Sequence, residues 1–438
     1  MTRAVTPRHR SAAGRLGVLS GLLLAATVAV SGCTGSALFG GGTAGGPAGA
    51  ATSSAGGGGG SGVAPSGGAT SGAKGASGAA PEGSGRVRGE FPVVSVGERI
   101  RLYAEARLST MTLEQKLASL VMVHVGGADP APLQAYLTAN QPAGLLLLGD
   151  NVPGSSAQAT ALTDALRQSE GLGTLVAIDE EGGIVARLAE DGYPAADTLK
   201  SEPVASTNDA FAQRAALLEA TGMTVNFGIV ADVTSDPGSF IFERALGTEA
   251  SSAAERVAAA VGAERGHVFS TLKHFPVHGA TAGDSHTSIP STSLPLDEWR
   301  SDVAPPFAAG IDAGAELVMF GHLAYTSVDA LPASLSPEWH RILREELGFE
   351  GVAVTDDLLM LEASGVPSYA DRTANAIAAV SAGNDVLLYN STVDLPPLVA
   401  SLAAAVRAGT IPASRVDDAA LHVLTLRREL WVQQHPAA

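Results

Sequence analysis

Short apolar segments alternate with longer stretches of helical character along most of this 438-residue chain. The apolar segments show little alternation between polar and apolar positions, which is typical of strands that are covered on both faces of a sheet. Eight such segments are predicted to be strands: Leu120–Val125, Ala143–Leu148, Thr174–Ile178, Thr224–Phe227, Ser270–Leu272, Leu317–Phe320, Val352–Thr355 and Val386–Leu388. The Ala-rich stretches between them predict helices at Gln158–Ser169, Asp209–Thr221, Ser252–Gly266, Ser336–Leu347 and Arg372–Ala382. Two closing helices are expected at Asp394–Ala408 and Ala413–Leu430.

Eight repeats of a strand followed by a helix predict an α/β fold of the (β/α)8 TIM-barrel type. An open, doubly wound sheet is the structural alternative, but no glycine-rich dinucleotide fingerprint follows the first predicted strand. A capping box at Thr112, with Gln115 three residues later, predicts the start of a helix before that strand. The globular part is expected to be a single catalytic domain over residues 91–438, with no room for a second large domain.

The first 32 residues have the pattern of a secretory leader. Four arginines open the chain (Arg3, Arg8, Arg10 and Arg15), and an apolar run from Leu16 to Val30 follows them. This run is short for a bilayer span and is placed where a signal-peptide core belongs. The sequence VSGC then resembles a bacterial lipobox and predicts Cys33 as the lipidated first residue of the mature protein. Cys33 is the only cysteine of the chain, so a disulfide within the chain is excluded.

Residues 33–90 combine the lipidated cysteine with a stretch dominated by Gly, Ser and Ala. Such a composition cannot bury enough apolar surface to offset its conformational entropy, so it predicts a flexible linker. We therefore expect an extracytoplasmic protein that is anchored to the bacterial cell membrane through Cys33 and functions as a monomer. The formal charge is −17, and removal of the four leader arginines would change it to −21. This acidic balance, without a basic run, argues against nucleic-acid binding.

Polar residues cluster where the predicted strands end, which is where TIM barrels carry their chemistry. These residues are Asp179 and the DEEGG run after the third strand, Asp232 and Arg244 after the fourth, Lys273 and His274 after the fifth, His322 after the sixth, and Asp356 and Asp357 after the seventh. Each of them alone could be a helix cap or a solvated charge. Together on one rim, they predict an acid-lined pocket with a few positive groups.

The loop from Lys273 to His286 contains three histidines and places Asp284 two residues before His286. In an extended turn, the carboxylate can hydrogen-bond to the imidazole, orient the ring and favour its protonated form. The pair would then supply a proton donor near neutral pH.

Asp356 is the candidate partner of that proton donor. By strand alternation it shares a face with Val352 and Val354, whereas Asp357 shares the other face with Thr355, so only one of the two can point along the barrel axis. A single ionised carboxylate that faces a protonated donor across a sugar is the arrangement of a retaining glycosidase.

The motifs KHFPVHG…DSH, DEEGG, ERALG, GHLAY and VTDDLLM occur in this order over roughly Leu113 to Leu388. In this respect the chain resembles glycoside hydrolase family 3, and in particular its single-domain β-N-acetylglucosaminidase branch. The resemblance implies Asp356 as the nucleophile, His286 as the general acid and base, and Asp284 as the residue that orients it.

The resemblance also implies that Asp179, Arg244, Lys273 and His274 bind the substrate, and that no cofactor takes part. His278 and His322 match the family pattern too, but could simply brace the loop or the strand end. No metal is expected, because the histidines do not have the spacing of a helical zinc motif and the domain contains no cysteine.

Three positions depart from the family pattern. Val277 stands where the family usually has glycine, Glu180 replaces a glutamine, and Ile184 replaces an arginine. The last two changes leave the substrate contacts open, particularly those to an anionic lactyl group.

Several functions remain open from the sequence. The expected activity is removal of terminal N-acetylglucosamine from a carbohydrate substrate such as peptidoglycan fragments, intact glycan ends or chitin fragments. Alternatives are a β-glucosidase or xylosidase, a phosphorylase, and a sugar-binding lipoprotein without catalysis.

Overall fold

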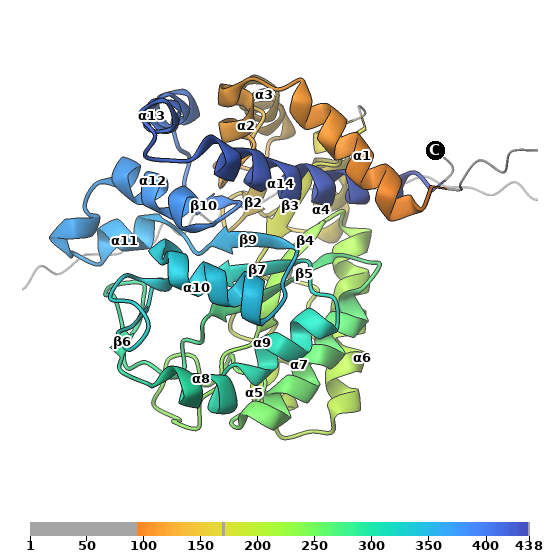
Figure 1. Cartoon of the computed structure of the whole chain (residues 1–438). Coiled ribbons are helices and arrows are strands. Elements are labelled where there is room, and N and C mark those ends of the chain that lie inside the picture. Colours follow the sequence, from red (N-terminus) through yellow and green to blue (C-terminus); the bar gives the residue numbers. More distant parts are fainter. Residues whose placement is uncertain (1–93, 169–170, 437–438) are drawn as a thin grey trace, which may run out of the picture. The chain divides into compact units, whose positions relative to one another are not determined.

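The computed structural model describes residues 94–168 and 171–436. The predicted signal peptide, Cys33 and the Gly-rich linker lie outside the described residues, and so do Ser169 and Glu170. The described residues belong to one folded unit. Its elements are shown in Figure 1.

Eight parallel strands form the central sheet, in the order β10-β1-β2-β3-β4-β5-β7-β9. A parallel bridge between Val354 and Val386 joins β9 to the segment that enters β10 and so closes the ring. The predicted TIM barrel is therefore confirmed. The eight strands are β1 (Val121–Val123), β2 (Gly144–Leu147), β3 (Leu175–Ile178), β4 (Val225–Val230), β5 (Phe269–Phe275), β7 (Leu317–Phe320), β9 (Val352–Thr355) and β10 (Leu387–Tyr389).

All eight predicted strands are present, and the fourth and fifth are longer than predicted. β5 continues from Leu272 to Phe275, so Lys273 and His274 lie in the strand itself and not in the loop after it. Outside the barrel, β6 (Ser291–Thr292) pairs with β8 (Ala324–Tyr325) in a small parallel sheet.

Helices follow the strands and cover the barrel. They are α1 (Val96–Ser109), α2 (Leu113–Ala118), α3 (Pro130–Asn140), α4 (Ser156–Leu166), α5 (Ala196–Leu199), α6 (Val204–Ala220), α7 (Ala250–Glu264), α8 (Leu296–Asp302), α9 (Pro305–Asp312), α10 (Pro337–Arg341), α11 (Leu359–Ala363), α12 (Arg372–Ala382), α13 (Leu395–Arg407) and α14 (Ala413–Gln434). The helix predicted at 336–347 is split, because a π-helical turn over Ile342–Glu346 follows α10. The predicted capping box starts α2, where Thr112 Oγ1 accepts from the Gln115 amide at 3.2 Å and Gln115 Oε1 accepts from the Thr112 amide at 2.9 Å.

Side-chain alternation along β9 determines which residues enter the barrel. Val352 and Val354 are buried in the same interior cluster as Phe227 and Met319. Ala353, between them, packs instead in the cluster that lies under the outer helices. The next even position, 356, therefore continues the interior face.

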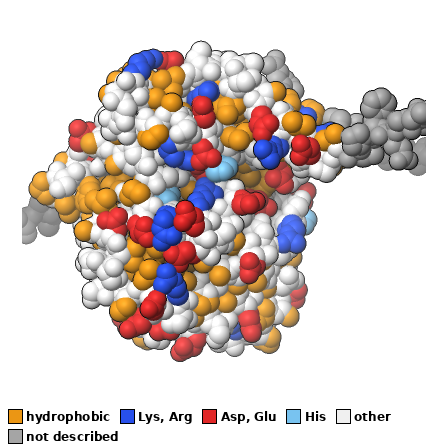
Figure 2. Space-filling view, in the orientation of Figure 1, with side chains coloured by type: hydrophobic (Ala, Val, Ile, Leu, Met, Phe, Trp, Pro, Cys, Tyr) orange, Lys and Arg blue, Asp and Glu red, His pale blue; other side chains and the backbone are white. Residues whose placement is uncertain are grey.

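Charged side chains of both signs are interspersed on the face of the molecule shown in Figure 2. Within residues 94–168 and 171–436, no helix combines the length and the apolar composition that crossing a bilayer requires.

Candidate active site

A cavity of about 210 Å³ lies at the carboxyl ends of the barrel strands. It is lined by Asp179, Glu181, Val185, Arg187, Phe240, Arg244, Lys273, His274, His278, Ser285, His286, Asp356 and Asn390, together with Leu148, Met319, Met360 and Leu388. Every residue predicted to touch the substrate therefore lines one cavity. Asp284, the remaining predicted site residue, is joined to it through His286.

Asp356 follows directly after β9, and its amide donates to the Phe320 carbonyl at 2.9 Å. Its carboxylate accepts a hydrogen bond from the Asp357 amide at 2.8 Å. Burial alone would raise the pKa of Asp356, but the His274 ring, the Asp357 amide and Lys273 outweigh it and hold the pKa below its usual value. The carboxylate is therefore ionised and available as a nucleophile.

A buried set of ion pairs surrounds Lys273. Lys273 Nζ lies 2.7 Å from Asp179 Oδ1 and 2.6 Å from Glu181 Oε1. Arg244 makes two further bonds to Glu181, at 2.8 and 2.7 Å. Burial would raise the pKa of Glu181, but the two cations reduce it to about 2. For Lys273, burial acts to lower the pKa, yet the carboxylates of Asp179 and Glu181 raise it. The site thus contains a permanent cation, fixed in place by two acids.

Asp232 is a fully buried carboxylate that positions the histidines of β5 and its loop. Its Oδ2 lies 2.7 Å from His274 Nδ1, and its Oδ1 accepts from the His278 amide at 2.5 Å. Burial opposes ionisation of Asp232, but the two histidines lower its pKa overall. Because Nδ1 of His274 is engaged, its Nε2 is the nitrogen left for the cavity.

His278 and His322 brace the site. His278 Nε2 lies 2.9 Å from Ser285 Oγ, and burial lowers the pKa of this ring to about 4. His322 Nδ1 contacts Ser334 Oγ at 2.7 Å. His322 Nε2 donates to the carbonyl of Asp357 at 2.9 Å, and burial lowers the pKa of His322. Both rings are neutral, hydrogen-bonded supports, so neither is suited to donate a proton to a substrate.

The Asp284–His286 pair forms as the sequence predicts. His286 Nδ1 lies 2.5 Å from Asp284 Oδ1, and the same oxygen accepts from the His286 amide at 2.9 Å. Burial would raise the pKa of Asp284, but these two hydrogen bonds lower it. The His286 side chain is 61% exposed, and Phe240 packs edge-on against it with 6.4 Å between ring centroids. With Nδ1 turned to Asp284, Nε2 of His286 is free to meet a substrate oxygen.

The three departures from the family pattern lie in different environments. Glu180 is fully buried, does not line the cavity, and accepts the amides of Arg187 and Leu188 at 2.9 and 3.1 Å. Ile184 is 67% exposed and is likewise absent from the cavity wall. Val277 is fully buried and adopts a φ of 133°, in the region that favours glycine.

Glu181 and Asp232 were predicted to lie on the rim but were given no role of their own, and Arg187 was not predicted. Glu181 and Asp232 hold the cationic and imidazole side chains described above. Arg187 lines the cavity, and no ion pair joins it to a carboxylate within residues 94–168 and 171–436. Its Nε is buried without a hydrogen-bond partner among those residues. Strand parity places Glu181 on the same face as Asp179, so its position beside Lys273 could have been found from the sequence, whereas no such signal marks Arg187.

Comparison with known proteins identifies the family. Residues 112–426 match the model of the glycosyl hydrolase family 3 N terminal domain. The chain belongs to glycosyl hydrolase family 3. The resemblance stated from the sequence motifs is therefore confirmed.

Several relatives of this family 3 chain are named as β-hexosaminidases or β-N-acetylhexosaminidases. It is 32% identical to the β-hexosaminidase LpqI of Mycobacterium tuberculosis over 369 residues, which cover 79% of this chain and 92% of LpqI. The solved structure of M. tuberculosis LpqI matches with a TM-score of 0.68 and 30% identity, over 74% of this chain and 96% of that one. The β-N-acetylhexosaminidase of Beutenbergia cavernae matches with a TM-score of 0.63 and 31% identity, over 72% of this chain and 98% of that one.

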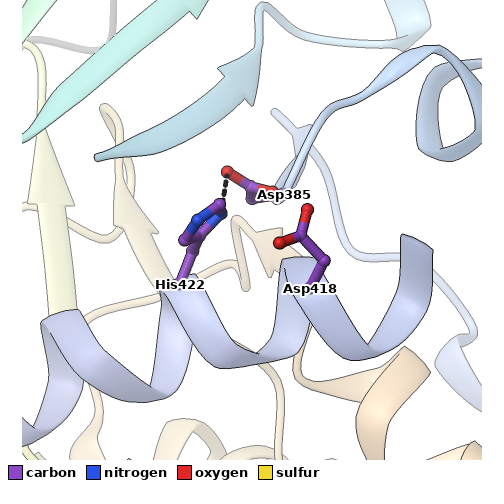
Figure 3. A group of neighbouring side chains, drawn as sticks. All are labelled: Asp385, Asp418 and His422. Atoms are coloured by element: carbon purple, nitrogen blue, oxygen red, sulfur yellow. Dashed lines mark ion pairs between the residues drawn. The ribbon is translucent and has the colours of Figure 1, made fainter. Parts of the chain in front are cut away.

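A second group of ionisable residues in this family 3 chain has the geometry of a metal site. Ligand atoms of Asp385, Asp418 and His422 lie within 4.8 Å of one another (Figure 3). Arg415, however, makes ion pairs with both carboxylates. Arg344 Nη2 also lies 2.7 Å from Asp385 Oδ2, and the cations and His422 lower the pKa of Asp385 to about 2 against the effect of burial. Guanidinium groups already neutralise these acids and would repel a metal ion, so we interpret the group as a structural ion-pair network.

Proposed function

We propose that this enzyme is an exo-acting, retaining β-N-acetylglucosaminidase that releases terminal N-acetylglucosamine from peptidoglycan fragments or related glycans. One observation carries the proposal: an ionised carboxylate, Asp356, and a carboxylate-bound imidazole, His286, line the same cavity at the catalytic end of a TIM barrel. The proposal would have failed if these two groups had faced separate cavities. The names of the relatives, β-hexosaminidase and β-N-acetylhexosaminidase, support the same substrate class.

In the first step, the Asp356 carboxylate attacks the anomeric carbon of the bound sugar while the glycosidic bond breaks. Nε2–H of His286 gives its proton to the departing oxygen, so the leaving group departs as a neutral alcohol. A covalent glycosyl–Asp356 ester remains. Asp284 assists by stabilising the ring through Nδ1 and by fixing its orientation.

In the second step, the neutral His286 accepts a proton from water as the water oxygen attacks the anomeric carbon. The ester bond to Asp356 breaks, and the carboxylate is regenerated. Two inversions at one carbon give net retention of configuration.

The cavity walls explain how the sugar would be held. Lys273 and Asp179 are adjacent and offer a donor and an acceptor to hydroxyl groups of a sugar ring, and Nε2 of His274 offers a third contact. Arg187 adds a guanidinium without a carboxylate partner among the described residues. Arg244 lines the same wall, but its Nε and Nη2 both donate to the Glu181 carboxylate. We therefore propose that Arg244 mainly positions Glu181.

The size of the cavity favours an exo-acting enzyme. Its volume of about 210 Å³ lies below the range of roughly 300–1,000 Å³ that is typical of sites for larger ligands. A cavity of this size suits one terminal sugar ring rather than the interior of a long glycan. Lipidation at Cys33 would place the enzyme outside the cytoplasm, where cell-wall fragments are the available substrate.

A panel of aryl β-glycosides that differ only at the 2-position tests this function. We expect the 2-acetamido sugar to be hydrolysed with a kcat/KM at least about a hundredfold above that of the 2-hydroxy sugar, since a site built for an amide rejects analogues that leave its polar groups unpaired. A preference for the 2-hydroxy sugar would instead identify a β-glucosidase. Absence of hydrolysis across the whole panel would favour a sugar-binding lipoprotein.

A separate measurement shows whether water or phosphate attacks the glycosyl–Asp356 ester in the second step. A neutral imidazole repels phosphate less than a carboxylate base would, so a phosphorylase is the nearest alternative. The released sugar should be identified in phosphate buffer. Free N-acetylglucosamine is the expected product, and a sugar 1-phosphate would show that phosphate replaces water.

A further inference from the structure

A second cavity, of about 630 Å³, lies at the opposite end of the barrel from Asp356. Its wall is formed where the chain enters β1, β2 and β3, and by α1 and α14 above these strand starts. The lining residues are Tyr103, Arg107, Met111, Gln115, Ser119, Leu137, Thr138, Gln141, Arg167, Gln168, Leu172, Leu424 and Arg427. The set contains three arginines and, among the described residues, neither an aspartate nor a glutamate.

That composition is unusual for a chain with a formal charge of −17. The arginine-lined groove around Arg341, Arg344 and Arg415 provides a contrast, because there each guanidinium is paired with at least one carboxylate. In the cavity under α1, only Arg167 has a carboxylate partner among the described residues, namely Asp164, and this pair is exposed to solvent.

Arg427 is the buried member of the set, with 6% of its surface exposed. Its Nε donates to the Gly173 carbonyl at 2.9 Å, and Nη2 donates to Gln168 Oε1 at 3.0 Å. Both acceptors are neutral, and no ion pair joins Arg427 to an acid within residues 94–168 and 171–436. Burial and, to a smaller extent, the nearby Arg107 together lower the pKa of Arg427 to about 10. A desolvated cation that faces a second cation is costly unless an anion compensates for it.

Arg107 is exposed at the edge of the same cavity and makes no ion pair with a described carboxylate. The last third of α1 therefore directs one guanidinium toward the space that Arg427 borders from α14. Gln141 and Gln168 add amide groups to the wall. Fixed guanidinium forks combined with neutral donors are the groups that bind phosphate oxygens.

We propose that this cavity is a binding site for a small phosphate-bearing anion, separate from the glycosidase site. Arg427 provides the buried anchor, and Arg107 closes over the anion from α1. The site is independent of the sugar chemistry at the other end of the barrel, so it does not depend on the proposed function.

Isothermal titration of the full-length protein with inorganic phosphate and with pyrophosphate tests the site. Pyrophosphate should bind, and its affinity should fall as NaCl is raised, because the contacts are ionic. Saturating N-acetylglucosamine should leave this binding unchanged. Displacement of pyrophosphate by the sugar would place it in the Asp356 cavity and overturn the proposal.

Variants of the two arginines give the decisive comparison. Arg107→Gln removes an exposed side chain and should weaken pyrophosphate binding about fivefold or more. Arg427→Lys keeps the charge but loses the guanidinium fork, and should weaken it about tenfold while circular dichroism shows an intact fold. The matched control is Arg101→Gln, which removes the same charge from the same helix but lies outside this cavity. Equal affinity in all four proteins, or an equal loss in the control, would overturn the assignment.

The phosphate group could belong to a free molecule or to a lipid headgroup. Vesicles of phosphatidylcholine that contain phosphatidylglycerol distinguish these sources. Binding of vesicles that is lost in Arg107→Gln but kept in Arg101→Gln would assign the site to a headgroup, and binding of pyrophosphate alone would assign it to a free anion. Failure of both probes to bind would exclude the site.

Discussion

Asp356 and Asp357 are adjacent at the end of β9, yet their pKa values shift in opposite directions. Asp356 faces the cavity, where His274, the Asp357 amide and Lys273 more than offset burial and lower its pKa. Asp357 faces the other side of the strand, where burial and the charge of Asp356 raise its pKa to about 6. Its Oδ1 accepts from the amides of Leu359 and Asn390, each at 3.1 Å. The first carboxylate is thus prepared for chemistry, and the second fixes the backbone that follows β9.

Exchanging each of these aspartates for asparagine should separate the two roles. Asp356→Asn should lower kcat by about a thousandfold or more, because the amide cannot form the glycosyl ester. Asp357→Asn keeps an oxygen that can accept hydrogen bonds from the two amides, so kcat should stay within about tenfold of the native value. The free energy of unfolding should fall by about 1 kcal/mol. Steady-state kinetics and urea unfolding of both variants provide the measurement. An equal loss of activity in both variants would contradict the assignment of the nucleophile.

The Asp284–His286 pair predicts a dependence on the leaving group. His286→Ala should lower kcat/KM by about 10²–10⁴ for aryl glycosides whose phenol is weakly acidic, because these need a proton on the departing oxygen. Strongly acidic phenols leave without that help, so the loss for them should be much smaller. Asp284→Ala should show the same trend with a smaller loss, since the imidazole remains but is no longer oriented.

A leaving-group series with kcat/KM as the readout checks this prediction. A uniform loss across the series in His286→Ala would mean that the histidine binds the sugar rather than protonating the oxygen. Asp179→Asn is a suitable comparison, because a residue that contacts the bound sugar should affect all leaving groups alike.

The barrel could be predicted from the sequence because its strands are covered on both faces. Runs such as 143–148 and 352–355 are apolar at nearly every position, and this signal survives without any knowledge of tertiary contacts. The end of β5 was missed for the opposite reason: Lys273 and His274 are polar, although their side chains are buried by ion pairs with Asp179, Glu181 and Asp232. α1 was missed because only Ile100 and Ala104 are buried in it, so it carries almost no apolar stripe.

Residues that line the cavity were easier to predict than those that hold them in place. The aspartates and basic groups at strand ends follow from the barrel itself, since its catalytic face is known in advance. Glu181 and Asp232 act by holding Lys273, Arg244 and His274, and such contacts depend on three-dimensional neighbours. Arg187 reaches the cavity from the turn after Gly183, and neither strand nor helix periodicity predicts where a side chain in such a turn points.

The backbone conformation of Val277 predicts an unusual order of stability for its alanine and glycine variants. Its φ of 133° strains a β-branched residue by roughly 1–3 kcal/mol, while its buried side chain stabilises the fold by a similar amount. Val277→Ala would lose the packing and keep the strain, whereas Val277→Gly would lose the packing and relieve the strain. The glycine variant should therefore be at least as stable as the alanine variant, although glycine is normally the less stable of the two.

Urea unfolding of the two Val277 variants gives the order directly. An alanine variant that is more stable than the glycine variant by about 1 kcal/mol would mean that the backbone is unstrained at this residue. Ala280→Gly, in the same loop but without a positive φ, should show the normal order with glycine less stable than the native alanine.

The buried carboxyl of Glu180 should make the folded protein less stable as the pH rises, so a variant without this carboxyl should gain stability relative to the native protein. Burial and, to a smaller extent, the neighbouring Asp191 together raise the pKa of this carboxyl from an ordinary value of 4.5 to about 8. Below pH 4.5 the group is protonated in both the folded and the unfolded chain, so it has no effect on stability. Between about 4.5 and 8 the unfolded chain releases the proton while the folded chain keeps it, and folding becomes less favourable as the pH rises. Above 8 the penalty is constant.

Glu180→Gln should remove this penalty, because the amide oxygen can still accept from Arg187 and Leu188 and the amide nitrogen can donate to Asp191. The variant should match the native protein near pH 4 and exceed it by roughly 1–3 kcal/mol near pH 8, with kcat unchanged because Glu180 does not line the cavity. Thermal unfolding of both proteins from pH 4 to 9 measures the difference. A pH-independent difference, or a less stable variant at pH 8, would mean that Glu180 is ionised in the fold and that another cation compensates for it.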